Sequence, residues 1–452
     1  MYDLKCFKAY DIRGVVPQEL NEELAYKIGI AYSSIINPST VIVGYDIRLE
    51  SLSLTNALID GLTDAGSNVI NIGLCGTEEV YYNSFSNKKI GGGIMITASH
   101  NPKGYNGMKM VKADAIPISL NDDLQLIRDF ILNDQQIDLR EKGLVSLNQD
   151  KSNYISHLLG YINISKLKPL KIVANPGNGP AGIIIKLLSK FLPFEFIYIN
   201  EEPDGNFPNG VPNPMVIENR KVTSDAVIQN KADLGIAWDG DFDRCFLFDE
   251  NGDFIEGGYI VGLLAEYFLK KKPRAKIIHD PRLVWNILDI VNENKGIALQ
   301  SKSGHSFIKE KMRLEDAIYG GEISAHHYFK DFAYCDSGML PWLIITEMIS
   351  DGNKKLSEMV KARISKFPCS SEINYKVDDK AEIIKTIIKY FTAQEPKIDY
   401  TDGISMEFFD WRFNLRESNT ENLLRLNVET NGKGKILQEC IVEIESIILS
   451  NT

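Results

Sequence analysis

The feature that most constrains the fold is a pattern that occurs three times, in which short β-rich apolar runs alternate with helical stretches and end in polar loops. The first stretch contains VIVGYDIR, NVINIGL and GGGIMITASHNP. The second contains KIVANPGNG, FIYINEE and LGIAWDGDFDR, and the third KIIHDPR, GIALQSKSGH and AIYGGEISAHH. This alternation predicts α/β domains with parallel or mixed sheets. Because polar residues follow the strands, we expect ligand sites at the carboxyl ends of the sheets.

The length and the end of the chain indicate several domains. At 452 residues the chain is too long to fold around a single hydrophobic core. A typical size of about 150 residues per domain suggests three or four domains. From about residue 370 the pattern changes to a helix, DGISMEFFDWRFN as strand–turn–strand, the loop LRESNTEN, the strand LLRLNVET and a closing helix. We therefore predict three similar α/β domains at 1–145, 146–252 and 253–367, and a smaller C-terminal α+β domain at 368–452.

Composition excludes several classes of protein. Hydrophobic residues make up 44% and charged residues 25%, which is typical of a globular chain, and the net charge is −11 with no basic stripe, so we expect no nucleic-acid partner. The six cysteines lack C-x-x-C spacing, which argues against a zinc site or a disulfide framework. No signal-peptide core and no run of about 18 apolar residues occurs, so we expect a cytoplasmic protein without a membrane partner.

Residues 239–243 read Asp-Gly-Asp-Phe-Asp between two apolar runs, LGIAW and CFLF. Three carboxylates at alternate positions of a strand-end loop can converge on one hard cation such as Mg²⁺, which prefers oxygen ligands. The alternatives are a solvated acidic turn and an EF-hand loop. The EF-hand is disfavoured because its sixth position is Arg244 rather than glycine.

Residues 97–102 read Thr-Ala-Ser-His-Asn-Pro after the apolar run GGGIMI. We expect Ser99 and His100 to lie exposed at the end of a strand, where the serine could carry a phosphoryl group. A turn or helix-cap hydroxyl is the alternative for an isolated serine. No G-x-S-x-G motif occurs, which disfavours a hydrolase.

Two further loops carry polar groups. Residues 320–327, GGEISAHH, offer a carboxylate, a hydroxyl and imidazoles to a sugar, and Ser303-Gly304-His305 follows another predicted strand. Residues 416–420, RESNT, combine a guanidinium with hydroxyls and an amide, which are donors suited to phosphate. Structural histidines and an ordinary capped turn remain open alternatives.

Residues 177–182, GNGPAG, resemble part of a dinucleotide-binding fingerprint, with Glu201 and Glu202 about twenty residues further on. Asn175 and Pro176 intervene after the strand, and no second cofactor-binding feature accompanies the loop. A nicotinamide-dependent oxidoreductase is therefore disfavoured, and glycines for a tight turn and close helix packing are the better interpretation.

Five motifs together resemble those of the α-D-phosphohexomutase superfamily, nearest to its bacterial phosphomannomutases. They are KAYDIRG (8–14), TASHNP (97–102), DGDFDR (239–244), GEISAHH (321–327) and RESNTE (416–421). The resemblance covers the whole chain and implies four domains around a central cleft. The chain departs from its relatives at Glu417 and Asn422, where proline is common, and at Arg282, where some carry lysine.

The resemblance also implies roles for individual residues. Ser99 is expected to be a phosphoserine, and Asp239, Asp241 and Asp243 to bind Mg²⁺ with the seryl phosphate. The other expected catalytic residues are Arg13, His100, Lys109, Arg244 and His305. Among them Lys109, Arg13 and His305 are candidates for proton transfer, which the sequence does not rank. The expected substrate-binding residues are Tyr10, Arg282, Gly304, Glu322, Ser324, His326, Arg416, Ser418, Asn419 and Thr420.

The activity that the resemblance implies is the interconversion of mannose 6-phosphate and mannose 1-phosphate through a hexose 1,6-bisphosphate, which also serves as activator. Glucose phosphate is expected as a second substrate, GDP-mannose and polysaccharide synthesis as the pathway, and a monomer or homodimer as the assembly. A non-catalytic sugar-phosphate-binding protein would lack the nucleophile or a metal ligand, and neither is missing.

Overall fold

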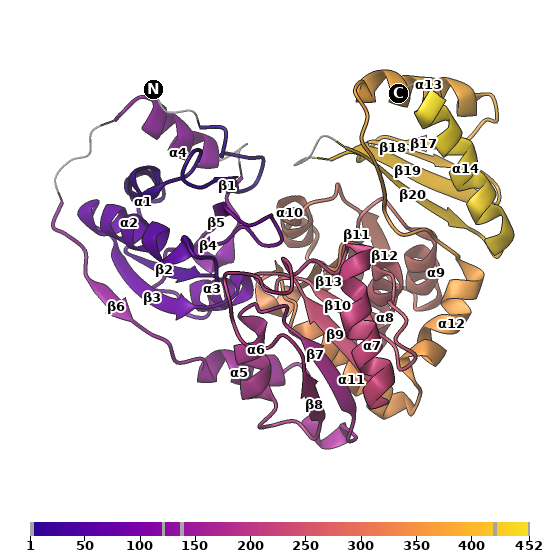
Figure 1. The fold of residues 1–452 in the computed structure, drawn as a ribbon, viewed down its shortest axis with the longest axis horizontal. Coiled ribbons are helices and arrows are strands. Elements are labelled where there is room, and N and C mark those ends of the chain that lie inside the picture. The colour runs from indigo at the N-terminus through magenta and orange to yellow at the C-terminus, as the bar shows by residue number, and fades with distance from the viewer. Residues whose placement is uncertain (1–3, 120–122, 136–139, 419–422, 451–452) are drawn as a thin grey trace. The chain divides into compact units, whose positions relative to one another are not determined.

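The computed structural model describes residues 4–119, 123–135, 140–418 and 423–450 (Figure 1). The chain forms two compact units: Met1–Phe254 with Asp331–Asn353, and Ile255–Lys330 with Lys354–Thr452. The return of residues 331–353 to the first unit is not indicated by the sequence pattern. The domain boundaries at 145, 252 and 367 stay predictions.

The first sheet of the first unit has six strands in the order β1-β5-β4-β2-β3-β6. Its central strands β2, β3 and β4 are parallel. At one edge β5 is antiparallel to β4, and β1 is antiparallel to β5. The elements of this part are β1 (Ile12–Val15), α1 (Glu22–Ile36), β2 (Thr40–Tyr45), α2 (Ser51–Asp64), β3 (Asn68–Leu74), α3 (Thr77–Phe85), β4 (Gly92–Ile96), β5 (Tyr105–Lys112), α4 (Asp123–Leu132) and β6 (Val145–Leu147).

Helices cover both faces of this sheet. Alternate residues of a strand point to opposite sides, so neighbouring residues of β2 pack into different cores. Val41 and Val43 of β2 join a core with α1, α2 and α4, whereas Ile42 joins a second core with Val80 of α3. Figure 1 shows α1 and α2 on one side of these strands and α3 on the other. Polar residues that follow the strands are therefore left at the sheet's carboxyl edge.

The second sheet of this unit has the order β10-β9-β7-β8, with β7, β8 and β9 parallel and β10 antiparallel. The glycine loop at residues 177–182 serves close packing, as predicted. A Cβ on Gly182 would lie 2.4 Å from the carbonyl oxygen of Glu201, so only glycine fits there. The elements here are α5 (Ser152–Leu159), β7 (Lys171–Asn175), α6 (Ala181–Leu188), β8 (Glu195–Tyr198), α7 (Lys221–Asn230), β9 (Leu234–Trp238), β10 (Cys245–Phe248), β15 (Cys335–Asp336) and α11 (Leu340–Gly352).

The returning helix α11 is tied to this unit at its N-terminus. The buried carboxylate of Glu78 accepts hydrogen bonds from the backbone amides of Gly338 (2.5 Å) and Met339 (3.1 Å). The indole of Trp238 donates to the carbonyl of Gly338 at 2.8 Å. These bonds supply partners for backbone groups that a helix start leaves unpaired.

In the second unit, strands β11 to β14 have the order β12-β11-β13-β14. β12, β11 and β13 are parallel, and β14 is antiparallel to β13. The elements are α8 (Gly257–Lys271), β11 (Lys276–His279), α9 (Trp285–Glu293), β12 (Ile297–Gln300), α10 (His305–Glu315), β13 (Tyr319–Gly321), β14 (His327–Phe329) and α12 (Leu356–Lys366). Short 3₁₀ helices elsewhere cover Ala113–Ala115, Ile164–Lys166, Ile217–Arg220 and Lys330–Phe332.

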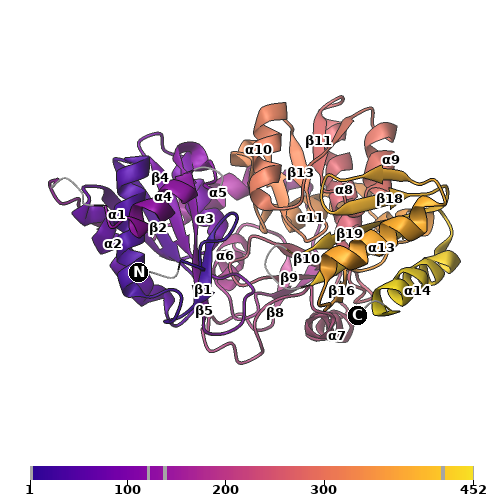
Figure 2. The same cartoon turned by 90° about the horizontal axis from the view of Figure 1, so that it is seen from above.

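The C-terminal part of this unit is an antiparallel sheet in the order β16-β20-β19-β18-β17. Phe413 and Leu415 of β19 pack with Ile387 of α13 and Ile444 of α14 in one core, and Figure 2 shows both helices against the sheet. The elements are β16 (Ile373–Tyr375), α13 (Lys380–Thr392), β17 (Lys397–Asp399), β18 (Ile404–Glu407), β19 (Trp411–Glu417), β20 (Leu424–Thr430) and α14 (Gly434–Ser450).

The opposite face of the C-terminal sheet is polar and buried. Arg412 of β19 donates to the carbonyls of Pro281 (2.9 Å) and Arg282 (3.0 Å) and pairs with Glu429 of β20 at 2.8 Å. Glu429 in turn accepts from the amides of Val284 (2.6 Å) and Trp285, at the start of α9. Hydrogen bonds thus join this sheet to the strand β11–helix α9 region.

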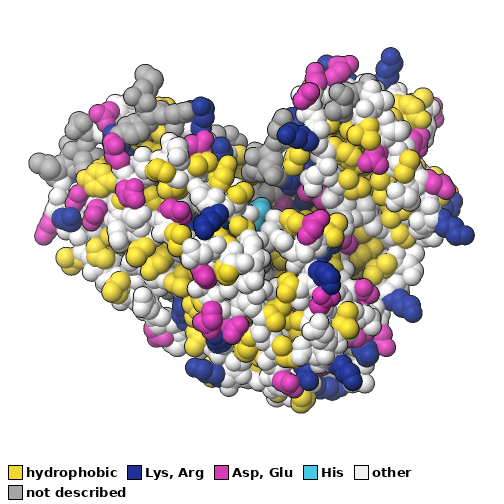
Figure 3. Space-filling view, viewed as in Figure 1, with side chains coloured by type: hydrophobic (Ala, Val, Ile, Leu, Met, Phe, Trp, Pro, Cys, Tyr) yellow, Lys and Arg dark blue, Asp and Glu magenta, His cyan; other side chains and the backbone are white. Residues whose placement is uncertain are grey.

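Lys and Arg side chains are interspersed with Asp and Glu on the visible face of the described residues (Figure 3). This distribution agrees with the absence of a basic stripe in the sequence. Within the described ranges, no helix has both the length and the apolar composition of a membrane span.

We predict that Glu429→Ala lowers the midpoint of urea unfolding and accelerates hydrogen exchange at Val284 and Trp285. The variant leaves the buried Arg412 without its carboxylate and two amides without an acceptor, which should cost roughly 3–5 kcal/mol. Glu417→Ala on the neighbouring strand removes a half-exposed carboxylate and should change stability by less than about 1 kcal/mol. Equal effects of the two variants would contradict the proposed tie.

Candidate active site

Ser99 lies in a sharp turn immediately after β4. Its φ of +49° is in the left-handed region, which is unusual for a serine, and its amide donates to Thr97 Oγ1 at 2.8 Å. The prediction that Ser99 is exposed is wrong, since only 4% of it is accessible, whereas His100 is partly exposed. The serine is buried because carboxylate, guanidinium and imidazole groups surround its hydroxyl.

Arg48 fixes the shape of this turn. Its guanidinium donates to four carbonyls, those of Ser99 (2.9 Å), Asn101 (2.6 Å), Pro102 (3.0 Å) and Tyr105 (2.9 Å). Arg48 was not among the residues predicted from the sequence. The only sequence signal was its place at the end of the first predicted strand run, VIVGYDIR.

The predicted convergence of three carboxylates is confirmed. Asp239, Asp241 and Asp243 follow β9 in the turn to β10, all three are buried, and one oxygen from each lies within 4.8 Å of the others. Ser99 Oγ donates to Asp239 Oδ2 at 2.7 Å. The serine hydroxyl therefore belongs to the same cluster as the carboxylates.

Two cations balance this negative charge. Arg244 donates to Asp239 through Nε (2.9 Å) and Nη2 (2.8 Å), while Lys109 Nζ donates to Asp241 (2.6 Å) and to Asp243. Burial raises the pKa of Asp239, and the positive charge of Arg244 opposes that rise. Burial disfavours the ammonium form of Lys109, but Asp241 and Asp243 outweigh it and raise the pKa of Lys109.

The cluster fits a divalent cation. Asp241 Oδ1 is buried and has no hydrogen-bond partner among the described residues, although an uncompensated carboxylate oxygen is costly to bury. Three carboxylates together form the all-oxygen donor set that hard cations prefer. The geometry thus supports a metal site at these three aspartates.

A glycine permits the contact between the serine turn and the aspartate turn. A Cβ on Gly240 would lie 2.3 Å from the carbonyl oxygen of Ser99, closer than any side chain can approach. Thr77 adds a hydrogen bond from its hydroxyl to Asp241. These contacts hold the hydroxyl of Ser99 close to the carboxylates of the aspartate turn.

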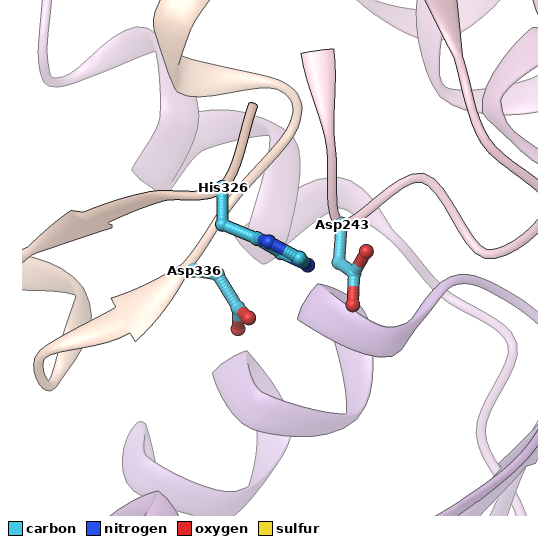
Figure 4. A group of neighbouring side chains, drawn as sticks. All are labelled: Asp243, His326 and Asp336. Atoms are coloured by element: carbon cyan, nitrogen blue, oxygen red, sulfur yellow. The ribbon is translucent and has the colours of Figure 1, made fainter. Parts of the chain in front are cut away.

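Asp336, from β15, is a further carboxylate of the first unit near Asp243 (Figure 4). Burial lowers the pKa of Lys109, and Asp241 and Asp243 raise it by more. The negative charge of Asp336 adds a smaller rise. His326, drawn in the same view, belongs to the second unit and is described with it.

The remaining predicted residues of the first unit lie on the same turn or beside β1. Arg13 donates to Asn101 Oδ1 (2.6 Å) and to Asp11 (2.6 Å), and His100 Nδ1 lies 3.0 Å from Ser99 Oγ and beside Arg244. Tyr10 precedes β1 and is partly buried. Arg13, in β1, is therefore bonded to the turn that carries Ser99 through the side chain of Asn101.

In the second unit, Glu322 is the centre of a hydrogen-bonded group in the turn between β13 and β14. It accepts from the amide of Gly304 (2.8 Å) and from the hydroxyl of Tyr328 (2.5 Å). Burial raises its pKa, and Arg282 opposes that rise. Tyr328, which lies in β14, was not identified from the sequence.

Ser324 and His326 complete this turn. Ser324 Oγ lies 3.2 Å from His326 Nδ1 and accepts from Arg282 at 3.3 Å. Arg282 is also paired with Asp280 at 2.7 Å. The structure thus brings together Arg282, Gly304, Glu322, Ser324 and His326, as the sequence predicted, while His305 begins α10 directly after Gly304.

Arg416 was predicted in a loop, and that prediction is wrong. It lies within β19, which extends to Glu417. Its side chain points to the polar face of the sheet, where it pairs with Glu372 at 3.0 Å. Ser418 follows the strand and its amide donates to Leu423 O at 2.9 Å. The predicted partners Asn419 and Thr420 lie outside the described residues.

Models of four successive domains match the chain in order. They are phosphoglucomutase/phosphomannomutase alpha/beta/alpha domain I at residues 4–137, domain II at 152–252, domain III at 256–367 and the C-terminal domain at 372–447. A protein of Xanthomonas campestris pv. campestris (strain B100) named "Phosphohexose mutases" is 54% identical over 445 residues, which cover 98% of this chain and 99% of that protein. The chain belongs to the phosphoglucomutase/phosphomannomutase family.

Other members of the family are similarly close. The phosphomannomutase of Escherichia coli (strain K12) is 52% identical over 445 residues, covering 97% of each chain. The crystal structure of a family protein from Burkholderia thailandensis matches with a TM-score of 0.88 at 28% identity, over 98% of this chain and 97% of that one. Family membership confirms the fold class of three α/β domains and a smaller C-terminal domain, and it excludes the oxidoreductase interpretation.

We predict that Gly240→Ala lowers thermal stability by roughly 1–3 kcal/mol, because the added Cβ forces the two turns apart. Gly352→Ala is a matched control, since nothing lies within 4 Å of the Cβ it would add. Differential scanning calorimetry would compare them. Equal melting temperatures for the two variants would show that the close approach does not constrain the turns.

Proposed function

We propose that this chain is a phosphomannomutase that interconverts mannose 6-phosphate and mannose 1-phosphate through a phosphoserine at Ser99 and a hexose 1,6-bisphosphate. The observation that carries the proposal is the position of Ser99 Oγ, 2.7 Å from Asp239 Oδ2 inside a buried cluster of carboxylates and cations. Several phosphomannomutases, including those of Escherichia coli (strain K12) and Vibrio cholerae, at 52% and 51% identity, support the choice of sugar.

In the proposed first half-reaction, the phosphoryl group of Ser99 passes to the free O1 or O6 of the bound sugar phosphate. The phosphorus bond to Ser99 Oγ breaks as the bond to the sugar oxygen forms. The sugar hydroxyl gives up its proton, and the departing Ser99 oxygen takes up one, so that Ser99 ends the step as a hydroxyl. In the second half, the bisphosphate returns its other phosphoryl group to Ser99. The same serine therefore serves both directions.

Such a transfer demands stabilisation of charge on the phosphoryl oxygens more than covalent help from the protein. Bound at Asp239, Asp241 and Asp243, Mg²⁺ would supply part of that stabilisation. Arg244 is placed to supply another part, since its Nη2 is 3.5 Å from Ser99 Oγ. Its double hydrogen bond to Asp239 keeps it oriented toward the serine.

Proton transfer is proposed for Lys109, Arg13 or His305. Burial disfavours the charged forms of Lys109 and Arg13, but neighbouring aspartates outweigh it and raise the pKa of both groups. Each of the two therefore holds its proton in this arrangement. They are better suited to donate a proton to the departing Ser99 oxygen than to accept one.

Sugar and phosphate recognition are proposed for the second unit. Glu322, held by Tyr328 and Gly304, presents a fixed carboxylate for sugar hydroxyls, and Ser324 and His326 lie beside it. Arg416 and Ser418 are proposed to bind the phosphate that is not reacting. Mannose phosphate is the proposed main substrate and glucose phosphate a second one, with a cytoplasmic monomer or homodimer serving GDP-mannose and polysaccharide synthesis.

We predict that Ser99→Ala lowers kcat by roughly 10³-fold or more, because the covalent route is lost. Intact-mass analysis should find one added phosphoryl group on the parent protein after treatment with a hexose 1,6-bisphosphate. The exposed Ser165→Ala variant should keep both the mass shift and the activity. Phosphorylation of the Ser99→Ala variant to the parent level would place the phosphoryl group elsewhere.

We predict that Asp241→Asn weakens Mg²⁺ binding by at least about tenfold, since it removes one charged oxygen ligand. Titration calorimetry with Mg²⁺ measures this without any turnover. Asp225→Asn, an exposed partner of Lys221 on α7, is the control and should bind Mg²⁺ as the parent does. Equal Mg²⁺ affinity in the two variants would remove the aspartates from metal binding.

A further inference from the structure

Three guanidinium groups of the second unit converge on one carboxylate, that of Glu372. Arg416 Nη2 lies 3.0 Å from Glu372 Oε2, Arg425 Nη1 lies 3.2 Å from Oε1, and Arg282 Nη1 lies 3.5 Å from Oε2. Arg416 and Arg425 are cross-strand partners on β19 and β20, whereas Arg282 follows β11. Glu372 thus links the two sheets of this unit at the guanidinium assigned to phosphate.

The carboxylate is required because the three cations repel one another. Burial lowers the pKa of Arg416, the positive charges of Arg282 and Arg425 lower it further, and Glu372 acts in the opposite direction. Burial also disfavours the charged form of Glu372, but the three arginines outweigh it and lower its pKa. Arg282 is also paired with Asp280, so the positive charge that Glu372 balances is mainly that of Arg416 and Arg425.

The backbone keeps Glu372 in this position. The segment before it is joined to β20, since Ser370 N donates to Val428 O (2.8 Å) and Val428 N donates to Ser370 Oγ (3.0 Å). Ser371 Oγ donates to Glu256. Arg416 has spare capacity, because its buried Nε has no hydrogen-bond partner within the described ranges.

The proposed function assigns Arg416 and Ser418, here called the phosphate clamp, to the phosphate that is not reacting. We propose that Glu372 is the resident counter-anion of this clamp. Glu372 holds Arg416 when no phosphate is bound, and it keeps phosphate binding weak enough for release. The inference rests on the proposed function, in which the bisphosphate leaves Arg416 and returns with its other end. Without Glu372, each release of phosphate would leave the buried guanidinium of Arg416 without its carboxylate partner, and such a state is costly. Glu372 is a positioning residue that acts through Arg416.

The test is Glu372→Gln, which keeps the shape and an acceptor oxygen but removes the charge. Inorganic phosphate should bind at least about tenfold more tightly by titration calorimetry, since a charge a few ångströms from the anion is lost. For mannose 1-phosphate, KM and kcat should both fall, because binding strengthens while release slows. Unchanged or weaker binding of inorganic phosphate would overturn the proposal.

Two variants control the measurement. Glu417→Gln removes a negative charge next to Arg416 in the sequence, but from a half-exposed carboxylate that pairs with Lys380 at 3.1 Å, and should leave phosphate affinity within about twofold. Arg416→Ala identifies the part of the binding that belongs to the clamp. An effect of Glu417→Gln as large as that of Glu372→Gln would reduce the result to net charge and overturn the assignment.

Stability provides a second measurement if Glu372→Gln folds less well. Added inorganic phosphate should then raise the Tm of the variant by more than it raises that of the parent, because phosphate replaces the missing anion. An equal or smaller rise would contradict the proposal. Since phosphate binding needs no turnover, a chain that lacked mutase activity would refute the proposed function and leave this test standing.

Discussion

The site of the first unit depends on the neutralisation of buried carboxylates. Asp239, Asp241 and Asp243 lie close enough to repel one another strongly in a low-dielectric interior. Arg244 and Lys109 make the arrangement possible by pairing with them. The same pairing brings Arg244 next to Ser99 Oγ, while Lys109 bonds to the other two carboxylates of the cluster. Electrostatic balance and the proposed catalytic arrangement therefore have one physical origin.

The second unit solves a related problem with the opposite sign. There Arg282, Arg416 and Arg425 share the carboxylate of Glu372, and Arg282 is paired with Asp280 as well. The polar face of the C-terminal sheet can be buried because its charges meet partners. Arg412 bonds to the segment that follows β11, Glu429 to the start of α9, and Arg416 to Glu372. A carboxylate holds the arginines where the proposed mechanism requires a phosphate to enter and leave.

Much of this could be predicted from the sequence, because strand alternation and the polar residues that follow each strand are local features. The aspartate triplet was predicted to converge from its spacing alone, and it does. Residues that act through long-range contacts could not be found in this way. Arg48 and Tyr328 lie in strand-like runs and acquire their roles only when the chain brings them to the Ser99 turn and to Glu322.

The errors have equally specific causes. Ser99 was expected to be exposed because its turn follows a strand, but the aspartate turn covers it, which depends on a glycine at position 240 far along the chain. Arg416 was placed in a loop because RESNT reads as polar, whereas β19 continues through it on the polar face of the sheet. Polarity indicates solvent exposure only where no partner is present.

The central claim is that the phosphoryl group on the enzyme is regenerated by a bisphosphate that both halves of the reaction share. The direct measurement is conversion of mannose 1-phosphate to mannose 6-phosphate by fully dephosphorylated protein with Mg²⁺, with and without a trace of hexose 1,6-bisphosphate. The account predicts almost no conversion without the bisphosphate and conversion to the equilibrium mixture with it. Conversion to equilibrium by dephosphorylated protein without any bisphosphate would contradict it.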